Sequence, residues 1–136
     1  MDSIIRSKLR IENLSRAYHL FAELRYSDIS SLSQLEKEGI IHRLRFTFEL
    51  AWKALIDKME TDGLVLNMIS PKAVLREAYK AKYIDHIDSW LKMIGDRNLM
   101  NHTYDFATFE LIIPTIIAEY IDILEALYLG LIENQL

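Results

Sequence analysis

The chain has 136 residues, 51% of them hydrophobic and 26% charged, which is ordinary for one globular domain spanning residues 1–136. It contains no cysteine, which excludes disulfides, thiolate nucleophiles and cysteine-ligated zinc and fits a reducing, cytoplasmic location. The formal net charge of −4 argues against strong non-specific RNA binding, because cationic side chains on phosphates supply most of that affinity. A local basic cleft is still compatible with this charge.

The C-terminal part of the chain is apolar and acidic. Residues 106–136 contain no Lys or Arg, whereas the first half of the chain is rich in both. The most apolar stretch, residues 111–131, is interrupted by Pro114, Glu119, Asp122 and Glu125, and charges near the middle of a membrane span are costly. Residues 1–6 lack an apolar run of signal-peptide length. We therefore expect neither a signal peptide nor a membrane helix.

Glycine and proline are scarce, at four and two residues, which favours helices over short strands joined by turns. The first helix is predicted over residues 3–25, where apolar side chains recur every three or four positions. Its apolar positions include Ile11, Leu14, Tyr18, Phe21 and Leu24. A second helix is predicted over residues 33–61, with Gly63 as its C-terminal cap.

Three further helices are expected after Gly63. Ser70 suits an N-cap and Pro71 the first helical position, so a third helix is predicted from there to residue 82. A fourth begins near Asp85, and a last one is capped by Asp105. Pro114 either kinks this last helix or marks its true start. The predicted fold class is therefore all-α, an antiparallel bundle of about five helices.

Residues 97–104, between the fourth and last predicted helices, read RNLMNHTY. In one continuous helix Arg97 and His102 would lie ~140° apart, since each residue turns the helix by ~100°. They converge only if the helix ends near residues 98–101. The weak helix formers of residues 101–105, with Asp105 as the next N-cap, predict such a break. In an extended turn, Tyr104 would point to the same side as His102.

The other histidines have no second metal ligand at a suitable spacing. His19 and His42 lie in long predicted helices, and His86 is predicted at a helix start. The sequence contains no HExxH motif, no P-loop and no dinucleotide-binding glycine pattern. We therefore expect no metal and no cofactor.

Four sequence blocks resemble one known family. Residues 97–104 match the R-N-x3-H-x-Y form of the motif that marks HEPN ribonucleases and their HepT-like toxins. Residues 45–53, RFTFELAWK, resemble the F-x-F-E-L-A-W-K block of nucleotidyltransferase substrate-binding proteins. Two further blocks follow the same order, at residues 70–78 and 90–98. Together the four blocks cover most of residues 40–110, which makes the resemblance specific.

The resemblance implies an antiparallel helical fold, a homodimer with the motif near its interface, and a minimal nucleotidyltransferase as partner. In the toxin members the motif cuts RNA without metal, and the nucleotidyltransferase antitoxin attaches AMP to the tyrosine of the motif. Carried over to this sequence, the resemblance makes Arg97 and His102 catalytic and Tyr104 the AMPylation site.

The residue types suit RNA cleavage. A free imidazole titrates near ~6.5, so His102 can act as a base on an RNA 2′-OH or as an acid at neutral pH. The planar guanidinium of Arg97 can bind phosphate oxygens and stabilise the charge that builds on the phosphorane. Because one His does not easily serve as base and acid in the same step, a dimer would supply both.

Two supporting residues have open roles at this point. Asn98 orients the phosphate or caps the helix. Glu49 orients Arg97 or His102, or else is an exposed or Arg45-paired carboxylate.

The intact motif favours a metal-independent endoribonuclease toxin, held off by modification of Tyr104. The alternative is a non-catalytic subunit that presents a substrate or nucleotide to the nucleotidyltransferase, and the acidic net charge is compatible with that role. A third possibility is a helical interaction module without a chemical site.

Overall fold

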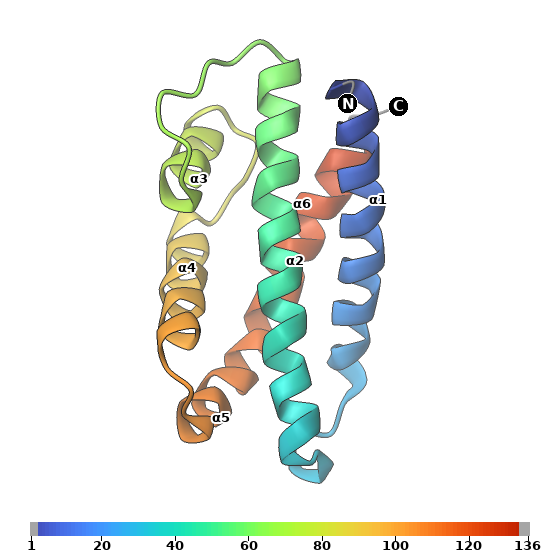
Figure 1. Cartoon of the computed structure of the whole chain (residues 1–136), viewed down its shortest axis with the longest axis vertical. Coiled ribbons are helices and arrows are strands. Elements are labelled where there is room, and N and C mark those ends of the chain that lie inside the picture. The colour runs from blue at the N-terminus through green and yellow to red at the C-terminus, as the bar shows by residue number, and fades with distance from the viewer. Residues whose placement is uncertain (1–2, 134–136) are drawn as a thin grey trace.

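The computed structural model describes residues 3–133, so the first two and last three residues of the predicted domain lie outside it. Over this range the chain is helical without any strand, and the helices pack side by side in an elongated bundle (Figure 1). The predicted all-α fold is confirmed. The α-helices are α1 (Ser3–Ala22), α2 (Gln34–Thr61), α3 (Pro71–Lys80), α4 (Ile87–His102), α5 (Phe106–Thr115) and α6 (Ile121–Glu133).

The long helix α2 runs through the middle of the bundle. It packs against α1 and α6 on one side, while α3 and α4 lie along its other side and α5 closes one end (Figure 1). The buried core draws on every one of these helices; its largest fully buried side chains include Phe21, Phe48, Leu55, Leu75, Trp90 and Tyr120. None of the helices in residues 3–133 combines the length and the hydrophobicity that a membrane span requires.

Local capping chemistry sets the ends of α2. The Ser33 hydroxyl accepts the N–H of Glu36 at 3.1 Å, and the Glu36 carboxylate accepts the N–H of Ser33 at 3.0 Å, which is a capping box. At the other end Gly63 has a φ of +92°, which glycine adopts without a steric cost. The N–H of the following Leu64 reaches the carbonyl of Met59 at 3.0 Å, so α2 ends in a Schellman motif, as predicted for Gly63.

The predicted starts of the later helices are largely confirmed. The Ser70 hydroxyl caps α3 by accepting the N–H of Ala73 at 3.3 Å, and Asp105 caps α5 by accepting the N–H of Ala107 at 3.1 Å. The fourth helix begins slightly later than expected, at Ile87, with His86 at the N-cap position in a left-handed conformation.

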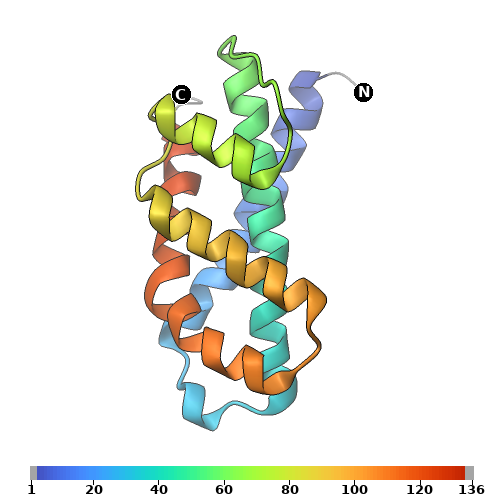
Figure 2. The same ribbon diagram turned by 90° about the vertical axis from the view of Figure 1, so that its left-hand side faces the viewer.

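The last helical segment bends after Pro114. This proline lies near the end of α5, and a π-helical turn, Ile116–Tyr120, then joins α5 to α6. In that turn the N–H of Ile121 bonds to the carbonyl of Ile116, five residues back. The chain changes direction between α5 and α6 (Figure 2). Pro114 therefore marks a kink rather than a helix start, and α5 with α6 forms the fifth helix of the predicted bundle.

Candidate functional site

The motif residues lie on one continuous helix and the connection that follows it. α4 runs without a break to His102, and Thr103 is the first extended residue, with φ −126° and ψ 124°. The predicted break before Asp105 is present, but it follows His102 and not residues 98–101. Met100 is only 2% exposed, so its packing in the core holds a stretch of weak helix formers in the helix. Arg97 and His102 consequently lie ~140° apart around α4, and one chain does not bring them together.

The guanidinium of Arg97 is fixed by three neighbours. Nη2 donates to Oε1 of Glu49 in an ion pair, and Nη1 donates to Oδ1 of Asn98 at 2.9 Å. The guanidinium carbon lies 5.5 Å from the ring centroid of Phe48, within the range of a cation–π contact. The Arg97 side chain is 18% exposed. Arg97 is therefore held in place before any ligand binds.

Glu49 lies between two partners. While one carboxylate oxygen accepts from Arg97, the other accepts the indole N–H of Trp52 at 3.0 Å. Trp52 stands three positions after Glu49 on α2, so both side chains lie on neighbouring parts of the same helix surface. The structure thus pairs Glu49 with Arg97, one of the two motif residues that it was predicted to orient.

Asn98 lies inside α4 and does not cap it, because the helix continues to His102. Its amide oxygen accepts from Arg97, which leaves its amide N–H groups as the donors available to a ligand. Of the two predicted roles, helix capping is excluded, and orientation of a phosphate stays a prediction.

His102 and Tyr104 differ from Arg97 in their exposure. His102 is the exposed last residue of α4, and Tyr104 is 89% exposed in the extended connection to α5. The Tyr104 ring meets the ring of Phe109 edge-on, with centroids 6.0 Å apart, so its hydroxyl end faces solvent. Both side chains are accessible to a macromolecular partner.

Sequence reasoning missed two groups of residues that support the motif. Trp52 and Phe48 flank Glu49 on α2, and their spacing from it was the available signal. The hydroxyl of the buried Tyr120 donates to the carboxylate of the half-buried Asp96 on α4, and no local pattern connects residues 24 positions apart.

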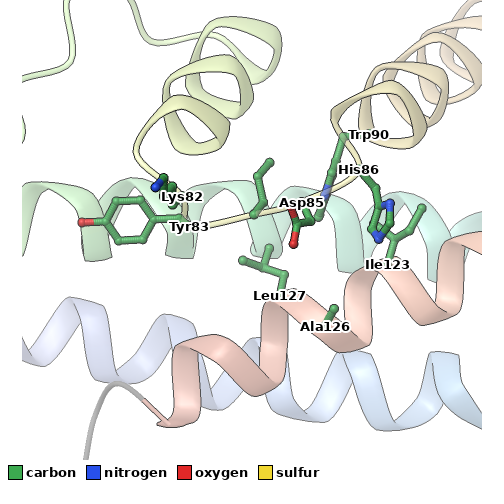
Figure 3. A pocket seen from close by; sticks show the side chains of 9 residues that line it. Lys82, Tyr83, Asp85, His86, Trp90, Ile123, Ala126 and Leu127 are labelled. Carbon is green, nitrogen blue, oxygen red and sulfur yellow. The ribbon is translucent and has the colours of Figure 1, made fainter.

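A cavity of about 190 Å³ lies at the other end of α4. It is lined by the connection between α3 and α4 and by Ile123, Ala126 and Leu127 of α6 (Figure 3). None of the motif residues lines it, so it is separate from the site around Arg97.

Comparisons with known proteins identify the family of this chain. The model of the family described as "Nucleotidyltransferase substrate binding protein like" matches residues 9–133, and the chain belongs to this family. The crystal structure of a Thermus thermophilus protein, ttk003001694, is similar, with a TM-score of 0.75 and 29% sequence identity. The likeness covers 87% of this chain and 98% of that one. A search of curated proteins finds no match.

Proposed function

We propose that this protein is a metal-independent endoribonuclease toxin, neutralised by a minimal nucleotidyltransferase. The main support for the proposal is the fixed guanidinium of Arg97, which Glu49 of α2 holds in place. Arg97 lies on α4, the helix that ends in the exposed His102. A fixed positive group and an accessible imidazole are what phosphodiester cleavage needs.

Cleavage proceeds by attack of the RNA 2′-oxygen on the adjacent phosphorus. The bond from the 2′-oxygen to phosphorus forms, the bond to the 5′-oxygen breaks, and the products carry a 2′,3′-cyclic phosphate and a 5′-hydroxyl. His102 removes the proton of the 2′-OH, and a second acid returns a proton to the leaving 5′-oxygen. Arg97, assisted by Asn98, binds the non-bridging phosphate oxygens, where negative charge builds in the transition state.

A second copy of the chain supplies the missing acid. Because Arg97 and His102 lie ~140° apart on one helix, a phosphate bound by one chain's Arg97 is better reached by a histidine from another. A two-fold pair would present two copies of His102 to one RNA strand. Light scattering should then give about 32 kDa, twice the mass of one chain, and a strict monomer at micromolar concentration would contradict this arrangement.

Tyr104 is the site at which the nucleotidyltransferase acts. Its hydroxyl oxygen attacks the α-phosphorus of ATP, AMP is transferred, and pyrophosphate leaves. The 89% exposure of Tyr104 supports this role, because a second enzyme must reach the hydroxyl. The attached AMP adds bulk and negative charge two residues from His102, and this charge repels an RNA phosphate.

A non-catalytic role is the second candidate. The family description itself names substrate binding, and the carboxylate of Glu49 offsets part of the charge that Arg97 would offer to RNA. In this role the surface around Arg97 would hold a substrate for the nucleotidyltransferase.

Incubating the purified chain with RNA in the presence of EDTA separates the two candidates. The toxin predicts RNA fragments that end in a 2′,3′-cyclic phosphate, formed at the same rate with and without the chelator. Intact RNA at every enzyme concentration, together with co-purification of the nucleotidyltransferase, would favour the binding subunit.

A further inference from the structure

We propose that Tyr120 is a positioning residue: through Asp96 it fixes the rotation of α4 about its axis, and with it the directions of the motif side chains. This inference rests on the proposed function as far as catalysis is concerned. The contacts that support it lie along one face of α4, at the edge of its buried side.

Tyr120 is fully buried, at 0% exposure, and its hydroxyl donates to the carboxylate of Asp96. Asp96 immediately precedes Arg97. Burial and the bond to Asp96 raise the pKa of Tyr120 well above its usual value, so the hydroxyl keeps its proton at neutral pH. The bond is therefore a constant tether between α4 and the π-helical turn.

The same turn holds α4 at two further points. The carboxylate of Glu119 accepts from the hydroxyl of Ser89 at 3.2 Å and from the ammonium group of Lys92 at 3.3 Å. Ser89, Lys92 and Asp96 follow one another at intervals of three and four, which places them on one face of α4. Two consecutive residues of the turn, Glu119 and Tyr120, thus form hydrogen bonds to a single face of α4.

The π-helical geometry of this turn directs its side chains toward α4. It follows Pro114, whose missing N–H interrupts the regular hydrogen-bond pattern at the end of α5. Such turns change the direction of side chains locally and are frequent at functional sites. In this chain the turn brings both a carboxylate and a phenol to α4.

The position of Asp96 determines where the two catalytic candidates point. Arg97 lies ~100° from Asp96 in one direction, toward the buried face of α4, and His102 lies ~120° from it in the other direction, on the exposed face. Turning α4 by about 20° would move side-chain atoms ~6 Å from its axis by ~2 Å. A misplacement of about 1 Å can cost ~10²-fold in rate. A tether at Asp96 therefore acts on the direction of both groups.

The variant Tyr120→Phe tests this role because it removes only the hydroxyl. We expect kcat for RNA cleavage to fall at least ~10-fold, with KM changed less than about two-fold and helicity unchanged. Tyr18→Phe is the matched control, since Tyr18 is also buried and also donates to a carboxylate, that of Glu125, but at the packing of α1 with α6. It should leave kcat unchanged.

A second pair of variants, at Asp96, tests the same hydrogen bond in case Tyr120→Phe does not fold. Asp96→Ala removes the acceptor of the same bond and should lower kcat as much, and combining it with Tyr120→Phe should add no further loss. Asp96→Asn keeps an oxygen acceptor and should restore most of kcat. Equal losses in Asp96→Asn and Asp96→Ala would overturn the proposal.

A measurement that does not depend on cleavage separates this inference from the proposed function. The side-chain Nε–H signal of Arg97 in a nuclear magnetic resonance spectrum should shift in Tyr120→Phe and stay in place in Tyr18→Phe. If the wild-type chain cuts no RNA, the toxin assignment fails while this signal still tests the tether. An unchanged Arg97 signal in a folded Tyr120→Phe variant would overturn the positioning role.

Discussion

The two halves of the R-N-x3-H-x-Y motif are held very differently by their own chain. Arg97 is paired with Glu49, bonded to Asn98 and stacked over Phe48. Within residues 3–133, by contrast, neither the His102 imidazole nor the Tyr104 hydroxyl has a hydrogen-bond partner. In the proposed function, the fold thus prepares the phosphate-binding group in advance and leaves accessible the groups proposed to meet RNA or a second enzyme.

The largest combined effect on cleavage and stability is expected when the fixed half is removed. In our account Arg97→Ala lowers the cleavage rate by about 10²–10³-fold, because the transition state loses its main charged donor. It also lowers the free energy of unfolding by about 1–3 kcal/mol, because the partly buried Glu49 carboxylate loses its partner. Urea unfolding and single-turnover cleavage measure the two losses. A variant as active as the wild-type chain would remove Arg97 from the mechanism.

A smaller effect on cleavage is expected when the ion pair between Arg97 and Glu49 is weakened but Arg97 is kept. Glu49→Gln keeps an oxygen acceptor and loses the charge, so the guanidinium is held less firmly and the cleavage rate should fall by about 10-fold. Glu60→Gln, at an exposed position on the same helix, is the matched control and should have no effect. Faster cleavage by Glu49→Gln would mean that Glu49 restrains Arg97 rather than orients it.

Tyr104, in the exposed half, should tolerate substitution without loss of cleavage but not without loss of regulation. Tyr104→Phe keeps the ring and deletes the hydroxyl, so cleavage should stay within a few-fold of wild type and stability within ~0.5 kcal/mol. With ATP and the nucleotidyltransferase, intact-mass analysis should find one added AMP on the wild-type chain and none on this variant. AMP on the Tyr104→Phe chain would place the modification on another residue.

The smallest effect concerns stability far from the motif. Hydrogen bonds from Tyr18 and Arg25 lower the pKa of Glu125. A lowered pKa in the folded state contributes stability that is present above the unfolded value of about 4.3 and is lost as the pH falls through the folded value. Glu125→Gln should therefore be less stable than wild type at pH 7, with the gap closing in acid. If the urea midpoints of Glu125→Gln and the wild-type chain differ by the same amount at every pH, the lowered pKa of Glu125 is not the cause.

The fold was predictable from the sequence wherever local chemistry decided it. Ser70, Asp105 and Gly63 act within a few residues of themselves, and each caps its helix as predicted. The end of α4 was not predictable in this way, because the burial of Met100 outweighs the weak helix formers around it.

The residue types of the candidate site were predictable from the sequence, but the contacts that hold those residues in place were not. Arg97, His102 and Tyr104 stand out by their motif alone. The pair of Glu49 with Arg97 joins residues 48 positions apart, so only the packing of α2 against α4 decides between its predicted roles. The π-helical turn had a partial signal in Pro114, yet nothing in the sequence connects Tyr120 to Asp96.

The most direct test of the account is cleavage of RNA by His102→Ala beside the wild-type chain. His102 is exposed at the end of α4, so its removal should leave helicity and unfolding unchanged. Loss of an essential acid–base group typically costs 10²–10⁴-fold, and we predict a loss of about this size in metal-free buffer. A folded His102→Ala chain that cuts RNA as fast as wild type would contradict the endoribonuclease assignment.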